Sequence, residues 1–154
     1  MHANLSADSI GSLDLPSRIE SELNQAGADP ANVVFEITET ALMGDMEAGE
    51  AFTRGITDIG SAVALDDFGT GYGSFTYLQK LHIAYIKIDI EFVRDLVSNT
   101  TNQHLVKAIV NIADGLGQQT IAEGVENSET LDLLREYGVE LAQGFHLGRP
   151  QPLG

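Results

Sequence analysis

The sequence predicts an α/β protein whose strands run parallel. Short apolar runs alternate with helical patterns at a repeat of roughly 20 to 35 residues, as expected for βαβ units. Barrel enzymes carry functional residues at the carboxyl ends of many strands, whereas open sheets concentrate them at one switch point. A polar residue ends nearly every predicted strand here: Asn4, Glu36, Asp66, Lys87, Glu123 and Gln143. The pattern therefore favours a (β/α)8 TIM-like barrel over a doubly wound sheet.

The number of predicted units is too small for a closed barrel. Eight βα units usually take about 250 residues, whereas this chain has 154 residues. About six units can be counted, and six parallel strands cannot close without leaving two edges. We therefore expect an incomplete barrel over residues 1–154, forming a single domain that lacks the N-terminal strands.

Residues that favour the start or the end of a helix predict the bounds of the helices. Pro16 and Gly27 bracket a helix, because proline suits the first turn and glycine the residue after the last. The helix after Asn102 has an apolar face of Leu105, Ile109, Ile112, Ala113 and Leu116. In chain order, we predict strand 2–6, helix 15–26, strand 33–39, helix 47–59, strand 62–65, short helix 74–78, strand 84–89, helix 102–116, strand 119–123, a helix capped by Ser128 that ends at Gly138, and strand 139–143.

The third predicted strand ends in two adjacent carboxylates, Asp66 and Asp67, which three alternate glycines follow. Adjacent strand residues point to opposite sides, so this alternation predicts different roles for the two carboxylates. A turn formed by these Asp and Gly residues, without function, is the simpler interpretation of this segment alone. The recurrence of polar strand ends along the whole chain favours a functional one.

Composition excludes several classes of function. The net charge of −15 argues against a basic surface that binds DNA or RNA. Cysteine is absent, so there is neither a disulfide framework nor a thiolate metal site, which fits a cytoplasmic location. No apolar run approaches the roughly 20 residues that span a membrane, so we expect no membrane contact by this segment. An acidic protein can still bind a small phosphate compound if a metal ion inverts the local field.

The strand-end residues suggest a metal site. Asn4, Glu36, Asp66 and Glu123 offer only oxygen atoms, which suit Mg²⁺, Mn²⁺ or Ca²⁺ rather than Zn²⁺. Lys87 could neutralise one carboxylate or hold a water. The four histidines are far apart and are interpreted as surface or satisfied core residues. Unrelated turn residues remain the alternative interpretation.

Six motifs, taken in order, resemble the EAL-domain family. They are Asn4-Leu5-Ser6, Glu36-Ile37-Thr38-Glu39, Asp66-Asp67-Phe68-Gly69-Thr70-Gly71, Lys87-Ile88-Asp89, Glu123-Gly124-Val125-Glu126 and Gln143-Gly144-Phe145. The family comprises bacterial cyclic di-GMP phosphodiesterases with a (β/α)8-like barrel in which one strand runs antiparallel. The resemblance implies hydrolysis of cyclic di-GMP to pGpG with Mg²⁺ or Mn²⁺, in a cytoplasmic bacterial signalling domain.

The resemblance also implies roles for individual residues. Asn4, Glu36 and Asp66 resemble the metal ligands, and Asp67 the carboxylate that joins the second metal. Lys87 resembles the residue that holds the attacking water, and Glu123 the general base. Glu39 resembles the anchor of the glycine loop, whose Gly69, Thr70 and Gly71 follow Asp67. Glu126 and Gln143 resemble supporting residues around the site.

One departure from the family is large. The Glu-Ala-Leu motif that names it occurs nowhere in these 154 residues. The chain is therefore predicted to be the C-terminal two-thirds of an EAL domain and to be inactive alone. A non-catalytic module that binds cyclic di-GMP or another protein is the alternative, and a barrel with Lys87 as a proton-abstracting base is a third possibility. Open strand edges predict a homodimer or higher oligomer.

Overall fold

The computed structural model describes residues 1–69, 75–144 and 151–152. The chain forms two compact units. Unit 1 comprises residues 1–66 and 71–84, and unit 2 comprises residues 67–70 and 85–154. Among the helices in the described ranges, none combines the length and the apolar character that a membrane crossing requires.

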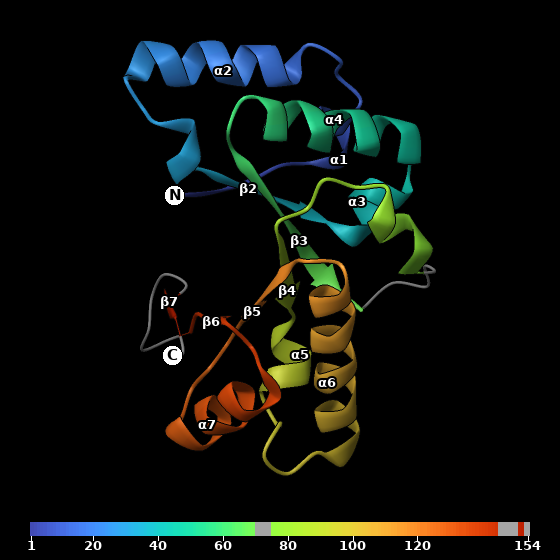
Figure 1. The fold of residues 1–154 in the computed structure, drawn as a ribbon, viewed down its shortest axis with the longest axis vertical. Helices are drawn as coiled ribbons and strands as arrows, with labels where there is room; N and C mark the ends of the chain where they lie inside the picture. The colour runs from blue at the N-terminus through green and yellow to red at the C-terminus, as the bar shows by residue number, and fades with distance from the viewer. Residues whose placement is uncertain (70–74, 145–150, 153–154) are drawn as a thin grey trace. The chain divides into compact units, whose positions relative to one another are not determined.

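Unit 1 contains three parallel strands and the helices that connect them (Figure 1). The strands pair in chain order, β1 with β2 and β2 with β3. Their bounds are β1 (His2–Asn4), β2 (Val34–Thr38) and β3 (Ala62–Phe68). The helices are α1 (Ala7–Ile10), α2 (Leu15–Ala26), α3 (Glu39–Met43) and α4 (Met46–Asp58), with 3-10 turns η1 (Pro30–Asn32) and η2 (Phe75–Gln79). Each strand is thus followed by helix, as the alternation predicts.

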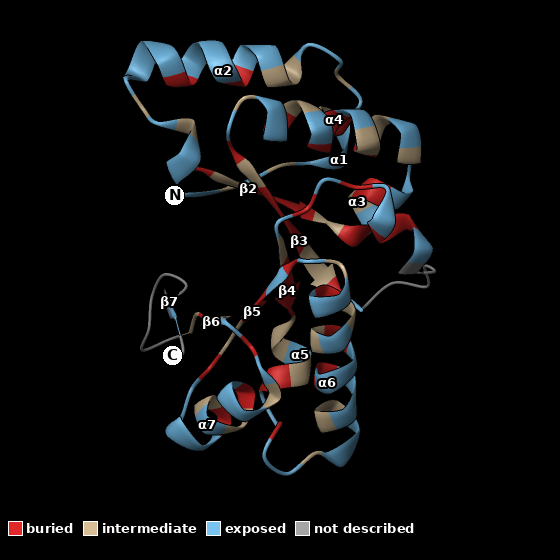
Figure 2. Ribbon diagram, viewed as in Figure 1, coloured by how far each residue is buried: buried red, intermediate tan, exposed pale blue. Residues whose placement is uncertain are grey.

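The core of unit 1 lies between the strands and α4. Phe52 and Ile56 of α4 are buried, as are Ile37 of β2 and Val63 and Leu65 of β3. Helix α2 packs against α4 (Figure 1), and its buried residues occupy only one of its sides (Figure 2). The polar residues that follow the apolar runs therefore lie at the carboxyl ends of the strands.

Unit 2 repeats the pattern with a second set of parallel strands. Its strands β4 (Tyr85–Ile88), β5 (Gln119–Ala122) and β6 (Leu141–Ala142) are parallel, and β7 (Gln151–Pro152) pairs antiparallel with β6. The helices are α5 (Ile90–Val93), α6 (Thr100–Gly115) and α7 (Ser128–Tyr137). Ile88, Ala122 and Ala142 lie in one row of the register. The three parallel strands therefore end at a common edge.

Most of the predicted elements are confirmed, but helices α1 and α3 were not predicted, and Glu39, expected in a strand, begins α3. Three further corrections concern α6, α7 and β7. Helix α2 has the predicted bounds, and Gly27 closes it in the left-handed conformation with φ 67°. On α6 the buried residues are Val106, Ile109 and Ala113, whereas Leu105 is 41% exposed. The helix is therefore rotated from the predicted face.

The other two corrections concern a cap and a strand. The cap of α7 is Asn127 rather than Ser128, since its side chain accepts from the backbone N–H of Thr130 at 2.8 Å. Strand β7 was not predicted, because two residues are too few to give a pattern. The predicted helix start at Ser74 lies outside the described residues.

Candidate functional site

Three of the predicted metal ligands lie on one face of the unit 1 strands. Asn4 of β1 and Glu36 of β2 are direct partners in the parallel register. Glu36 is also opposite Ala64 of β3, and Asp66 follows two residues later on that strand. Residues at i and i+2 of a strand share a face. Unit 1 thus presents Asn4, Glu36 and Asp66 on the same side of its strands, as the resemblance requires.

Glu36 has a partner that the sequence did not reveal. The His2 Nδ1 donates to Glu36 Oε1 at 2.6 Å, and the Glu36 residue is only 7% exposed. His2 precedes Asn4 by two residues and shares its face. The expectation that His2 is a surface or satisfied core residue therefore misses this contact with a candidate ligand. The i, i+2 spacing of His2 and Asn4 on one strand was the available signal.

The backbone at Asp67 overturns the expectation that the two adjacent carboxylates diverge. Asp67 has φ 55°, the one positive value among the described non-glycine residues. Left-handed conformations are uncommon outside glycine, although Asp and Asn tolerate them better than other residues. Strand alternation stops at this residue, so Asp67 does not point opposite to Asp66. Their carboxylate oxygens lie within 4.8 Å of each other.

Unit 2 contains a buried ion pair between two predicted catalytic residues. Lys87 Nζ lies 2.5 Å from Glu123 Oε1, and the side chains are 3% and 18% exposed. The backbone explains the approach. Lys87 is opposite Ile121 in the β4–β5 register, and Glu123 lies two residues further along the same face. The Glu123 N–H donates to the Ile88 carbonyl at 3.0 Å, which fixes the start of the segment after β5.

Asp67 of unit 2 lies near this ion pair. The carboxylates of Asp67 and Glu123 offer oxygens within 4.8 Å of one another, and Asp66, bonded to Asp67, belongs to the same group. Carboxylates this close repel unless a cation lies nearby. The donor set consists of oxygen alone, which fits a hard divalent ion. The acidic cluster is therefore a possible metal-binding site.

The remaining predicted residues of unit 2 lie close to this end of the strands. Gln143 follows β6, and its N–H donates to the Ala122 carbonyl at 2.9 Å. Gly69 has φ 90°, and a Cβ there would meet the Phe92 ring at 3.4 Å. Glu126 is exposed. Thr70 and Gly71 lie outside the described residues.

The predicted anchor Glu39 forms a buried hydrogen bond in unit 1. Tyr77 Oη donates to Glu39 Oε1 at 2.5 Å, and the two residues are 8% and 3% exposed. Burial raises the pKa of the Tyr77 phenol, and the bond to Glu39 and its negative charge raise it further. Tyr77 lies on η2, which follows the glycine-rich segment in the chain. Sequence reasoning missed Tyr77, because nothing local distinguishes it from a core tyrosine.

Comparison with protein families decides the classification. The model of the EAL domain matches residues 1–150. The chain belongs to the EAL domain family. The match covers almost the entire chain and includes all six motifs, so the resemblance read from the motifs is confirmed.

Two similar curated proteins are named as cyclic di-GMP phosphodiesterases. The chain is 39% identical over 150 residues to the cyclic di-GMP phosphodiesterase PdeB of Shewanella oneidensis. It is 34% identical over 150 residues to the cyclic di-GMP phosphodiesterase NbdA of Pseudomonas aeruginosa. Each match covers 97% of this chain, but only 18% and 19% of the relatives. The chain thus spans about a fifth of the length of these proteins.

Solved structures confirm the fold class. The chain matches the PaMucR phosphodiesterase in complex with c-di-GMP with a TM-score of 0.89 and 33% identity, over 98% of this chain and 61% of that one. It matches the Klebsiella pneumoniae BlrP1 complex with calcium and cyclic di-GMP with a TM-score of 0.87 and 32% identity, over 99% of this chain and 39% of that one. The fold is α/β, with six parallel strands that form part of a TIM-like barrel.

Proposed function

We propose that this chain supplies most of the catalytic residues of a cyclic di-GMP phosphodiesterase that hydrolyses its substrate to pGpG. The observation that carries the proposal is the buried Lys87–Glu123 ion pair, with the Asp67 carboxylate near Glu123. A lysine that is 2% exposed is costly to bury unless its charge is compensated. Its position next to an acidic cluster, at the ends of strands, is typical of a functional site.

Each residue of the pair has a chemical role in this proposal. The Lys87 ammonium has three N–H donors and pairs with Glu123. In this proposal it also orients a water near the cluster. Glu123 remains 18% exposed at its side chain, so its carboxylate can accept a proton from that water. Gln143, on the neighbouring strand end, can donate an amide hydrogen to the substrate.

Asn4, Glu36 and Asp66, on the shared face of the unit 1 strands, would hold Mg²⁺ or Mn²⁺, and Asp67, the next residue in the chain, would join a second ion. A divalent ion, when bound, supplies positive charge to the phosphate oxygens that gain negative charge during hydrolysis. The relative of known structure that holds calcium with cyclic di-GMP supports a divalent ion in this family. The bond from His2 holds the Glu36 carboxylate in a defined orientation.

A non-catalytic module that binds cyclic di-GMP or a partner protein is the alternative. The absence of Glu-Ala-Leu from the 154 residues favours it for the chain by itself. Removal of groups that merely support a metal ligand typically costs about 10–100-fold in affinity or activity. We therefore expect turnover by the isolated chain to be at least that far below turnover by the same chain preceded by a segment that carries the motif.

An assay for pGpG with saturating Mn²⁺, with cyclic di-GMP binding measured in parallel, tests this proposal. In the longer protein, Glu123→Gln should abolish turnover and retain binding, whereas Glu129→Gln, at an exposed position of α7, should change neither. Equal turnover by the short and long chains would contradict the expected inactivity. Binding without turnover by the longer protein would instead support the non-catalytic module.

A further inference from the structure

His2 contacts a proposed metal ligand from one register step nearer the amino ends of the unit 1 strands. It lies opposite Val34 in the β1–β2 register, and Glu36 follows two residues later on the same face of β2. Two residues of a strand span about 6.6 Å, so the histidine side chain has to reach along the strands to meet Glu36. It does so, because His2 Nδ1 lies 2.6 Å from Glu36 Oε1. The contact joins the proposed metal site to a residue that none of the six motifs contains.

The hydrogen bond between His2 and Glu36 is compatible with metal binding. A carboxylate that binds a metal ion is ionised and only accepts hydrogen bonds, so Nδ1 of His2 is the donor. An ionised carboxylate has about four lone-pair positions on its two oxygens, and one hydrogen bond to Oε1 uses one of them. The same carboxylate can therefore accept from His2 and bind an ion.

Strand pairing fixes the backbone at both ends of this contact. On one side of His2, the Val34 N–H donates to the Met1 carbonyl at 2.8 Å. On the other side, the Leu5 N–H donates to the Glu36 carbonyl at 3.0 Å. The register cannot slip without the loss of both bonds. Strand pairing thus sets the backbone positions of His2 and Glu36, and the bond between their side chains sets the direction of the carboxylate.

The two side chains differ in burial. The Glu36 side chain is 8% exposed, whereas the His2 side chain is 29% exposed. A carboxylate buried to this degree requires hydrogen-bond partners or a cation. A ring that is nearly a third exposed is not held by core packing alone. The bond therefore contributes more to the placement of Glu36 than to the packing of His2.

His2 fits the role of a partner of a ligand better than the role of a ligand. The proposed ligands Asn4, Glu36 and Asp66 offer oxygen, which Mg²⁺ and Mn²⁺ prefer, whereas imidazole suits Zn, Cu, Fe and Ni. Among the described residues, no histidine belongs to a group of three close candidate ligands. Groups that donate to a ligand fix its orientation, and their loss typically costs about 10–100-fold in metal affinity or activity.

We propose that His2 is a positioning residue of the metal site, whose Nδ1–H holds the Glu36 carboxylate in the orientation that binds Mg²⁺ or Mn²⁺. This inference rests on the proposed function, because it takes Glu36 as a metal ligand. It adds a residue that the resemblance to the family does not assign, since the first motif begins at Asn4.

The test is a titration of the 154-residue chain with Mn²⁺ at one fixed pH, in which the electron paramagnetic resonance signal reports the free ion. Glu36→Gln identifies the site first. It removes a proposed ligand, so it should weaken the tightest class of binding by at least the roughly 10–100-fold expected for loss of an outer partner. Weak binding of Mn²⁺ by the exposed carboxylates of this acidic chain should not respond to that substitution.

Two substitutions of His2 separate the hydrogen bond from the volume of the side chain. His2→Leu retains an apolar side chain but has no donor, and it should weaken Mn²⁺ binding about tenfold or more. His2→Asn places an amide nitrogen the same number of bonds from Cα as Nδ1, so it should restore most of the lost affinity. The control His104→Leu, at an exposed position of α6, should leave the affinity unchanged.

A purely structural role for His2 predicts a different result. If the bond only stabilised the pairing of β1 with β2, His2→Leu would lower the melting temperature but leave the Mn²⁺ affinity of the folded chain unchanged. Melting temperatures without metal, together with affinities measured well below them, distinguish the two roles. If His2→Leu does not fold, His2→Ala provides the same comparison.

The failures of this inference and of the proposed function are distinguishable. Unchanged affinity in His2→Leu, with a clear loss in Glu36→Gln, would overturn the inference and leave the proposed metal site intact. No loss in Glu36→Gln would overturn both, because Glu36 would then not be a ligand. A loss in His2→Leu that His2→Asn does not reduce would also overturn the inference, because the N–H donor would then not be the group that sets the affinity.

Discussion

At the scale of single residues, the buried Lys87 and Glu39 each have a partner for their charge. Lys87 has Glu123, and Glu39 has the hydroxyl of Tyr77. Breaking such a buried ion pair typically costs about 3–5 kcal/mol, because the remaining charge stays uncompensated. Asp67 adds a different cost, a left-handed backbone that holds its carboxylate close to that of Asp66. Strain of this kind persists where the surrounding structure imposes it, and it clusters at functional sites.

Tyr77→Phe should lower the free energy of unfolding by about 1–3 kcal/mol at neutral pH, because Glu39 loses a buried hydrogen bond. The loss should depend on pH. The pKa of Tyr77 is raised in the folded state, so its stabilising effect is fully present below the unfolded pKa of about 10. The effect is lost as the pH rises from there toward the folded pKa.

Denaturant titrations at neutral pH and above pH 10 measure both effects. Tyr85→Phe is the control, because Tyr85 is only half-buried on β4. It should change the free energy of unfolding by much less than Tyr77→Phe. Equal losses for the two variants would show that the Glu39 bond contributes nothing particular to stability.

At the scale of the helices, α4 and α6 each begin at a side-chain cap. Asp45 caps α4 and Asn99 caps α6, each by accepting from a backbone N–H three residues on. Two helical glycines, one inside α4 and one at the last position of α6, have opposite surroundings. A Cβ at Gly55 of α4 would lie 2.7 Å from Pro16 of α2, whereas one at Gly115 of α6 would meet nothing within 4 Å. The approach of α4 to α2 therefore depends on Gly55.

Gly55→Ala and Gly115→Ala should change stability in opposite directions. Alanine gains about 1 kcal/mol over glycine in a helix interior such as Gly55, and less at Gly115, the last residue of α6. At Gly55 the added methyl forces α2 and α4 apart, and overpacking typically costs about 1–3 kcal/mol. We expect a lower free energy of unfolding for Gly55→Ala and a higher one for Gly115→Ala, measured by denaturant titration. A gain in both variants would show that α2 adjusts without cost.

At the scale of the whole molecule, charge and strand edges determine how the chain behaves in solution. The net charge is −15, so separate chains repel at low ionic strength. In unit 1, β1 pairs with β2 through residues His2–Asn4, and its other edge has no strand among the described residues of that unit. An unpaired edge is a template for association with another chain.

We expect the 154-residue chain to form a dimer or higher oligomer, more completely as salt screens the negative charge. Sedimentation equilibrium over a range of protein and salt concentrations measures this. Met1 and Leu5 bond to β2, so the alternate residue His2 turns its backbone N–H toward the open edge of β1. A His2→Pro variant removes that donor and should weaken association more than His2→Ala if the edge is used. A folded monomer at high protein concentration and high salt would contradict the expectation.

The sequence by itself determined the order of the elements, because local chemistry sets them. Pro16 and Gly27 predict the bounds of α2, and the apolar runs predict the strands that end at Glu36, Asp66 and Glu123. The motifs at these strand ends were sufficient to predict the family. These features depend on residues adjacent in the chain, for which proline geometry, glycine conformations and side-chain periodicity are reliable guides.

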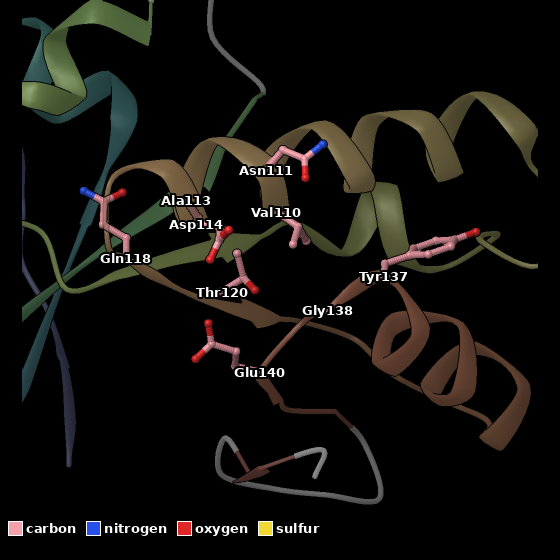
Figure 3. A pocket seen from close by; sticks show the side chains of 9 residues that line it. All are labelled: Val110, Asn111, Ala113, Asp114, Gln118, Thr120, Tyr137, Gly138 and Glu140. Carbon is pink, nitrogen blue, oxygen red and sulfur yellow. The ribbon is translucent and has the colours of Figure 1, made fainter.

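Only the tertiary structure decided which polar groups meet. The left-handed backbone of Asp67, the bond from His2 to Glu36 and the bond from Tyr77 to Glu39 were not predicted. The last two contacts join residues 34 and 38 positions apart, and such contacts depend on strand register and packing rather than on neighbouring residues. A pocket lined by Val110, Thr120 and Glu140 (Figure 3) likewise exists only because α6, β5 and the turn before β6 come together in space. Local preferences specify each of these elements, whereas the burial of their shared faces brings the side chains together.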